Sequence, residues 1–200
     1  MFSGASAFNQ DLSNWNVGRV THMDNMFNGA SSFEQVLCGA KWEVSAVTSM
    51  WSMFSDASAF NRTLSNWNVS AVTDMRDMFS GASAYNQDMA EWDVSAATNM
   101  GSMFSSAYAF NQDLSKWDVS AVTDMKFMFY KASAFNQDVS KWDVSAVTDM
   151  SSMFYGALSF YRQPCGAAWE DSKADKTDMF TGSPASTVLT KRTATKHGYS

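Results

Sequence analysis

The 200-residue chain is poor in the residues that build several common kinds of site. It has 2 cysteines, too few for a disulfide-stapled scaffold, and 2 histidines, which leave little room for a histidine-based metal or catalytic site. No run of about 18 apolar residues occurs, so we expect no insertion into a membrane. Charged residues make up 17% and hydrophobic residues 46%, which excludes wholesale disorder and favours a chain with a sizeable core.

Tryptophan and methionine, by contrast, are abundant, and both recur with a fixed period. Met-Phe pairs keep this period from Met1-Phe2 to Met153-Phe154. An aromatic residue precedes each Trp by 7 residues, or by 9 at Phe33 and Phe160. The Trp positions are 25 residues apart, or 27 at the first and last steps: Trp15, Trp42, Trp67, Trp92, Trp117, Trp142 and Trp169. The chain is therefore a repeat of 25 residues, and two of its coils carry a two-residue insertion.

Each repeat contains two apolar patterns that predict secondary structure. Leu114, Trp117 and Val119 have the spacing of a leucine-rich-repeat strand, with Trp117 and Val119 on one side of it. The next apolar residues follow a helical spacing: Met125, Met128, Phe129, Ala132 and Phe135. We therefore predict an α/β fold, a leucine-rich-repeat solenoid with one short parallel strand and one short helical segment per coil, whose stacked Trp, Val, Met and Phe columns form the core.

The repeat also sets the expected domain limits. About seven coils over residues 1–184 form a single repeat solenoid, with a degenerate last coil as the C-terminal cap, and residues 185–200 form a flexible basic tail. Met1-Phe2 is in register with the later pairs and no signal-peptide pattern precedes it, so we expect either a fragment or a cap further upstream.

A polar column is predicted on the outward side of the strand: Asn16, Glu43, Asn68, Asp93, Asp118 and Asp143. Its most economical interpretation is a solvated face of mixed charge. A second is a face that binds a polar ligand, centred on Asp93, Lys116, Asp118, Lys141 and Asp143. A third is a divalent cation site, but one carboxylate per coil is few for Ca²⁺.

Two further columns have structural and functional alternatives. The Asn column is expected to hydrogen-bond the backbone of adjacent coils, with a calcium ladder as the alternative: Asn9, Asn61, Asn86, Asn111 and Asn136. The Thr column is expected to cap the helical segments, with an ice-binding face as the alternative: Thr21, Thr48, Thr73, Thr98, Thr123 and Thr148.

Cys38 and Cys165 occupy equivalent places five coils apart, which is about 24 Å in a regular stack and too far for a disulfide between them. We expect each to be a small buried residue in its insertion loop, with an intermolecular disulfide as the alternative. No nucleophile–His–acid grouping, phosphate-cradling glycine loop or zinc spacing occurs. The sequence thus predicts no enzyme, no cofactor and no metal site.

The segments F-N-Q-D-L-S-K-W-D-V-S-A-V-T-D-M (110–125) and M-F-Y-K-A-S-A-F-N-Q-D (128–138) resemble BspA-type leucine-rich-repeat surface proteins. The resemblance is to the branch with repeats of this length, which is also seen in mycoplasma lipoproteins, and it covers about residues 1–180. It implies a secreted or surface-displayed protein, extracellular or at the cell surface, that is not an enzyme.

From this resemblance we expect an extended face for protein or glycan binding and adhesion, with a partner on another cell or matrix. The alternative is a structural subunit that self-assembles end to end into a filament or coat. Residues 1–180 hold 11 basic and 20 acidic side chains, a net charge of −9, while the tail carries Lys191, Arg192 and Lys196. An acidic body argues against nucleic acid as the partner.

Overall fold

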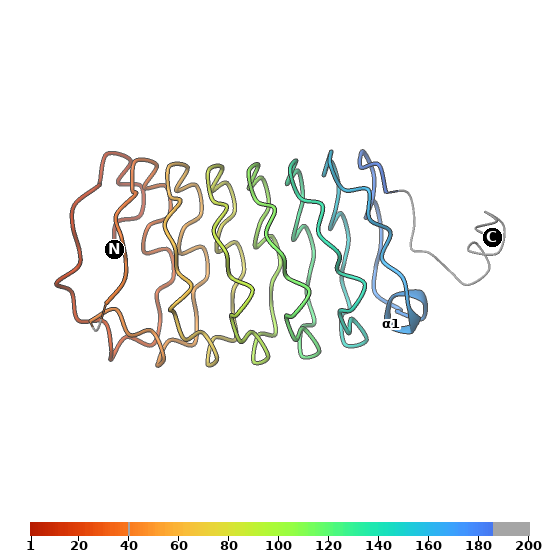
Figure 1. The fold of residues 1–200 in the computed structure, drawn as a ribbon, viewed down its shortest axis with the longest axis horizontal. Coiled ribbons are helices and arrows are strands. Elements are labelled where there is room, and N and C mark those ends of the chain that lie inside the picture. Colours follow the sequence, from red (N-terminus) through yellow and green to blue (C-terminus); the bar gives the residue numbers. More distant parts are fainter. Residues whose placement is uncertain (40, 186–200) are drawn as a thin grey trace.

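The structure is a computed structural model that describes residues 1–39 and 41–185. The described chain winds into a row of coils that lie side by side, from the N-terminal coil at one end to the coil that carries α1 at the other (Figure 1). Coil 4 comprises residues 85–109, coil 5 residues 110–134 and coil 6 residues 135–159. Backbone hydrogen bonds join neighbouring coils at equivalent positions: Thr123 N donates to Thr98 O at 2.9 Å, and Thr148 N donates to Thr123 O at 2.8 Å.

The coils contain almost no regular secondary structure, so the predicted α/β leucine-rich-repeat solenoid is wrong. Within the described residues, the one helix is α1, Ala167–Glu170, in the last coil. Between described residues, parallel pairing consists of isolated bridges that join one residue of each coil to the next, through His22, Ser49, Asp74, Asn99, Asp124, Asp149 and Asp175. The expected strand around residues 114–119 and the expected helical segment over residues 125–135 do not form.

Side-chain turns explain why the strand does not form. The Asp113 carboxylate accepts the N–H of Ser115 at 2.8 Å, and the Asp118 carboxylate accepts the N–H of Ser120 at 3.0 Å. An acceptor two residues before its donor bends the backbone into an Asx turn. In addition, Trp117 N donates to Leu114 O at 3.1 Å. These turns bend the segment before it can extend along a neighbouring strand.

Two left-handed residues per coil explain why the helix does not form. In coil 5 they are Phe127, with φ 58°, and Lys131, with φ 55°. A residue in this conformation interrupts a right-handed helix. Phe127 N instead donates to Ser151 O of the next coil at 3.0 Å, whereas Met128 N donates to Met125 O at 3.1 Å within its own coil. The segment is therefore a run of tight turns that alternates bonds within the coil and bonds to the next.

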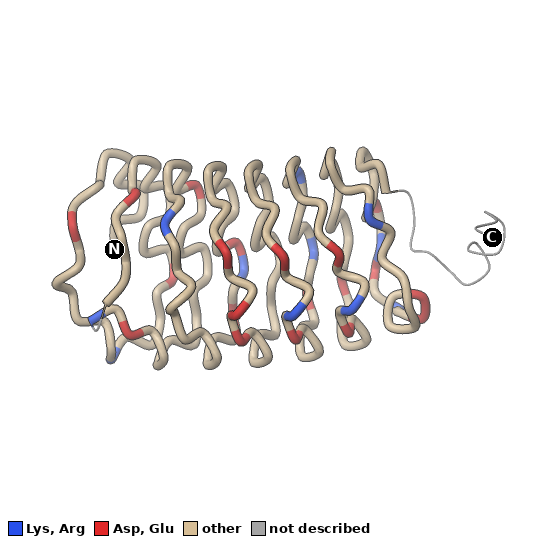
Figure 2. The backbone as a smooth tube through the Cα atoms, in the orientation of Figure 1, with Lys and Arg blue, Asp and Glu red and all other residues tan. Residues whose placement is uncertain are grey.

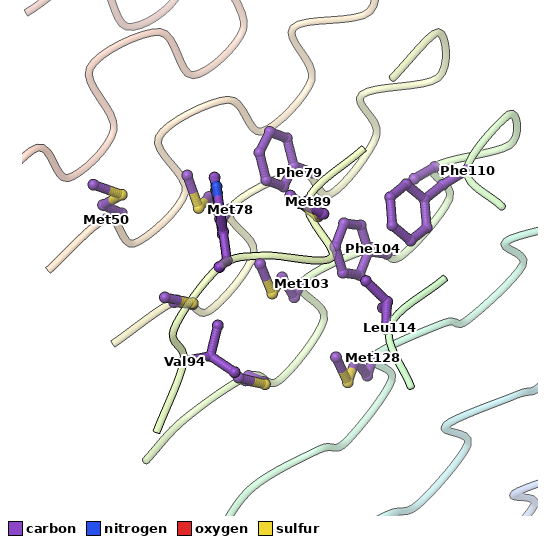
Figure 3. Packing of buried hydrophobic residues seen from close by; sticks show 14 of the residues in the cluster. Met50, Met78, Phe79, Met89, Val94, Met103, Phe104, Phe110, Leu114 and Met128 are labelled. Carbon is purple, nitrogen blue, oxygen red and sulfur yellow. The ribbon is translucent and has the colours of Figure 1, made fainter. Parts of the chain in front are cut away.

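The predicted core columns are confirmed. Phe104 has no exposed surface, and its ring lies nearly parallel to those of Phe79 and Phe129, with centroids 5.8 and 5.6 Å away. Met103 and Met128 occupy equivalent core positions of successive coils (Figure 3). Stacking lets each coil bury an apolar surface that it could not bury alone.

The polar atoms of the buried tryptophans are satisfied across coils. The indole N–H of Trp117 donates to Met89 O at 3.0 Å, and that of Trp142 donates to Leu114 O at 2.9 Å. Both bonds reach the preceding coil. Because a buried donor without an acceptor is costly, these bonds favour one register of the stack.

The expected structural role of the Asn column is confirmed. Asn111 N donates to the side-chain oxygen of Asn86 at 2.9 Å, and Asn136 N donates to that of Asn111 at 2.9 Å. The expected capping role of the Thr column is wrong, because no helix follows it. The Thr123 hydroxyl instead donates to Thr98 O at 3.1 Å, so this column also joins successive coils.

The last described coil contains α1 and the buried Trp169, and its Phe180 ring stacks on Phe154 at 5.6 Å. Its role as a cap and the domain limit at residue 184 stay predictions. The expected tail, apart from Ala185, lies outside the described residues. In the part of the chain that the structure describes, no helix has the length and apolar character needed to cross a membrane.

Candidate functional site

Three residues of the predicted binding face form an exposed column. Asp93, Asp118 and Asp143 occupy equivalent positions of coils 4, 5 and 6, and all three are exposed. Acidic positions recur at the same level of neighbouring coils in the middle of the row (Figure 2). We call these three residues the acidic column.

The serine two residues further along the chain orients each carboxylate of the acidic column. The hydroxyls of Ser95 and Ser120 donate to Asp93 and Asp118 at 2.6 Å, and the backbone N–H groups of the same serines also donate to them. The Ser145 N–H donates to Asp143 at 3.0 Å. One oxygen of each carboxylate is thus held by its own turn.

These hydrogen bonds also keep the column charged. Donation from the serine hydroxyl, and then from the serine N–H, lowers the pKa of Asp93, Asp118 and Asp143 below the ordinary 3.8. The negative charge of Asp118 opposes this effect at Asp93 and at Asp143. At neutral pH the column therefore presents one negative charge on each of three successive coils.

The two lysines of the predicted face do not neutralise the column. Lys116 forms an ion pair with Glu91 of the preceding coil, and the two side chains are 65% and 75% exposed, so the pair stabilises the fold little. This hydrogen bond raises the pKa of Lys116. The N–H and hydroxyl of Ser115 lower the pKa of Asp113, in the turn before the tryptophan, and the charges of Lys116 and Lys141 add to this effect. The five predicted residues therefore form two separate groups.

A groove that the sequence analysis missed lies at the C-terminal end of the acidic column. It encloses about 600 Å³ between coil 6 and the last coil. Asp143, Ser145 and Thr148 line it from coil 6, while Asp171 and Lys173 line it from the last coil. The available signal was the two-residue insertion before Trp169, which lies in the segment where α1 forms. The groove adds a partly enclosed end, lined by both polar and apolar side chains, to an otherwise open surface.

The two cysteines are free and exposed, so their expected burial is wrong. Each is followed by a glycine in a left-handed conformation: Gly39 has φ 98° and Gly166 has φ 103°. These glycines allow each insertion to turn outward rather than into the core. Disulfide formation with another chain stays a prediction.

The geometry gives no support to a calcium ladder. In residues 1–39 and 41–185, no three His, Cys, Asp or Glu side chains gather closely enough to hold a metal ion. The Asn side chains of the proposed ladder accept backbone N–H groups instead. The Thr hydroxyls of the proposed ice-binding face donate to backbone carbonyls of the preceding coil.

Stacked coils with repeating cores and varied outer turns define the molecule as a repeat protein. Its sequence matches the family described as "Mycoplasma protein of unknown function, DUF285" over residues 1–109 and again over residues 86–191, and the chain belongs to this family. The matches overlap by about one coil, as expected where coils are interchangeable. They support a Mycoplasma-type repeat protein and do not extend to the BspA type. Comparison with curated proteins gives no match, and comparison with solved structures gives none either.

Proposed function

We propose that this protein is a non-enzymatic repeat protein that presents an extended face for protein or glycan binding and adhesion outside the cell. The observation that carries the proposal is the acidic column, in which Asp93, Asp118 and Asp143 stay charged and exposed on successive coils. Such a row is complementary to an extended partner that carries several positive charges. The groove beside Asp143 offers that partner an anchoring point.

Two further points support this proposal. Family membership shows a Mycoplasma-type repeat protein. The finer likeness of residues 110–138 to BspA-type surface proteins supports a location at the cell surface. The likeness bears on sequence and location, since the coil itself is not a leucine-rich-repeat coil.

Charge reversal tests the proposed face. The double variant Asp118→Lys/Asp143→Lys should bind a basic matrix protein or aminated glycan at least about tenfold more weakly than the wild type, because two attractive contacts become repulsive. Affinity is measured by biolayer interferometry on a panel of immobilised matrix proteins and glycans.

Asp11→Lys is the matched control for charge reversal. Asp11 also accepts the N–H and hydroxyl of the serine two residues later, but it lies in the first coil. The Asp11→Lys variant should therefore bind with the affinity of the wild type. Unchanged affinity of the double variant, or an equal loss of affinity in Asp11→Lys, would show that the acidic column is not the binding face.

The end coil favours a second candidate function, end-to-end self-assembly. Phe2, Phe8 and Trp15 at the N-terminal end of the stack are only partly buried, whereas Phe27 and Phe33 further along the chain have no exposed surface. An apolar coil face can stack on another copy of the chain. Light scattering tests this: mass that grows from 22.1 kDa with concentration supports assembly, growth that reductant abolishes assigns it to Cys38 and Cys165, and a constant mass excludes it.

A further inference from the structure

The outer turns of coils 5 and 6 bring together aromatic and basic side chains at positions where most of the other coils carry small or polar ones. Phe127 and Tyr130 meet edge to face with ring centroids 5.5 Å apart, and Tyr155 of the next coil stacks on Tyr130 at 5.2 Å. The ammonium of Lys126 lies 5.1 Å from the Phe127 centroid, and that of Lys131 lies 5.0 Å from the Tyr130 centroid. We call these five residues the aromatic–lysine patch.

The backbone at this turn does not favour these residues. Phe127 and Lys131 both lie in the left-handed region, at φ 58° and 55°. The equivalent left-handed positions of other coils hold small or turn-forming residues: Asn25, Gly29, Ser52, Asp56, Asp77, Gly81, Ser102, Ser106, Ser152 and Gly156. A bulky side chain in this region is unfavourable. The aromatic and basic residues are therefore not there to form the turn.

The core does not need these residues either. Phe127, Tyr130 and Tyr155 are half-buried, while Lys126 and Lys131 are exposed. Each Lys lies over a ring face, which holds the ammonium near the surface of the turn. Side chains that contribute neither to the turn nor to the core are available for a ligand.

The positive charges of the two lysines are also not neutralised by an ion pair among the described residues. Among the described residues, neither Lys126 nor Lys131 takes part in an ion pair. Asp124 accepts the backbone N–H of Lys126 at 2.9 Å. The hydroxyl and N–H of Thr177 lower the pKa of Asp175, and the charge of Lys126 adds to this effect. The patch is thus a local cationic site on a body whose net charge over residues 1–180 is −9.

A second aromatic–cation pair, on coils 2 and 3, differs from the patch in that its cation is paired with a carboxylate. Trp51 and Arg76 each occupy the position that Lys126 has in coil 5, and the Arg76 guanidinium lies 5.3 Å from the Trp51 ring centroid. Arg76, however, donates to both carboxylate oxygens of Asp74, so this carboxylate neutralises its positive charge within the molecule. The Trp51–Arg76 pair is therefore a natural control for aromatic–cation contact without free charge.

We propose that the aromatic–lysine patch binds an anionic polysaccharide of low charge density, in which one carboxylate recurs per disaccharide. The two ammonium groups are complementary to carboxylates, and the apolar C–H faces of sugar rings can pack on the aromatic rings of Tyr130 and Tyr155. A densely charged polyanion would be repelled by the surrounding acidic body. The proposal uses none of the acidic-column residues, so its test is independent of the test of the acidic column.

Hyaluronan, which carries one carboxylate per disaccharide, is the probe. The wild-type protein should bind immobilised hyaluronan and not the neutral polysaccharide dextran. Lys126→Glu/Lys131→Glu should weaken binding at least about tenfold, since each reversal replaces attraction by repulsion. Tyr130→Ser/Tyr155→Ser should weaken it about tenfold through the lost ring contacts while leaving both lysines in place. Ser is the residue of Ser105 at this position in coil 4, so the fold should persist.

Trp51→Ser is the matched control, because Ser151 occupies the same position in coil 6. It should bind hyaluronan like the wild type, and all variants should keep the wild-type unfolding temperature within a few degrees. Failure of the wild type to bind hyaluronan overturns the proposal. So does an equal loss in Trp51→Ser. Binding of polyglutamate as tight as that of hyaluronan, with no loss in Tyr130→Ser/Tyr155→Ser, would assign the patch to acidic polypeptides and also overturn it.

Discussion

Coils 4 and 5 share an interior but differ at one outer turn. Met103 and Phe104 of coil 4 are fully buried, as are Met128 and Phe129 of coil 5. The outer turn of coil 4 reads Gly101, Ser102, Ser105 and Ser106, whereas that of coil 5 reads Lys126, Phe127, Tyr130 and Lys131. Both turns nevertheless have left-handed residues at the same two places.

This difference shows that inward-facing and outward-facing positions are under different structural constraints. Every inward side chain stacks on its counterpart, so a change there affects both neighbouring coils. An outward side chain only has to tolerate its backbone conformation. Fold and binding should therefore be separable by mutation.

The largest expected effect is on the interior. Phe104→Ala removes a fully buried ring that stacks on Phe79, Phe110 and Phe129, so it should lower the free energy of unfolding by about 3–5 kcal/mol. Ser105→Ala on the outer turn of the same coil should change it by less than about 0.5 kcal/mol. Urea denaturation measures both. Similar losses in the two variants would contradict the separation of interior and exterior.

A smaller effect is expected at Tyr85, the one member of the buried Phe column that carries a hydroxyl. This hydroxyl is buried without a hydrogen-bond partner. Tyr85→Phe should raise the free energy of unfolding by about 1 kcal/mol, because the polar group no longer has to be desolvated. Phe110→Tyr, the reverse change in the next coil, should lower it. A destabilised Tyr85→Phe would mean that the hydroxyl does have a partner.

The same residue predicts a dependence on alkaline pH. Burial raises the pKa of Tyr85 above the ordinary 10.0. Above pH 10 the unfolded chain therefore loses the phenol proton while the folded chain keeps it. Stability should fall as the pH rises beyond 10, and it should fall less steeply in Tyr85→Phe. Equal slopes in thermal melts across this range would contradict the burial of the ionisable hydroxyl.

The smallest expected effect is on the left-handed outer position. Lys131→Gly places at φ 55° the residue that Gly81 and Gly156 supply in other coils, so it should stabilise the fold by about 0.5–1 kcal/mol. Gly81→Ala should do the opposite, because a Cβ there would lie 2.2 Å from Oδ1 of Asp56 at φ 70°. Calorimetry of the two variants tests whether each substitution raises or lowers the stability of the fold. Destabilisation by Lys131→Gly would show that this lysine supports the fold.

The period and the core were predictable from the sequence because the Trp and Met-Phe positions are in phase through the whole chain. The local backbone was not. The spacing of Met125, Met128 and Phe129 fits a helix, but it fits a run of tight turns equally well. The signal against the helix was the recurrence of Gly, Asn, Asp and Ser at the positions of Phe127 and Lys131, which is typical of left-handed residues.

The candidate site was predictable only in part. Asp93, Asp118 and Asp143 follow from the repeat register and are exposed as expected. The pairing of Lys116 with Glu91 depends on the lateral position of two long side chains, which the repeat pattern does not determine. The aromatic–lysine patch was hidden because its contacts depend on the left-handed turns at Phe127 and Lys131, which the apolar spacing does not reveal.

The separation of fold from binding is tested most directly by moving the aromatic–lysine patch one coil toward the N-terminus. One variant combines Gly101→Lys, Ser102→Phe, Ser105→Tyr and Ser106→Lys in coil 4 with removal of the original groups by Lys126→Gly, Phe127→Ser, Lys131→Ser and Tyr155→Ser. Tyr130 then takes the place that Tyr155 has in the wild type.

Hyaluronan affinity and unfolding temperature are measured on this variant and on a second variant that carries only the removals. The account predicts that the removals abolish binding, that the additions in coil 4 restore it to within about threefold of the wild type, and that both variants unfold within a few degrees of it. A folded protein whose binding is not restored, or a stack that melts when its outer turns are exchanged, would contradict the account.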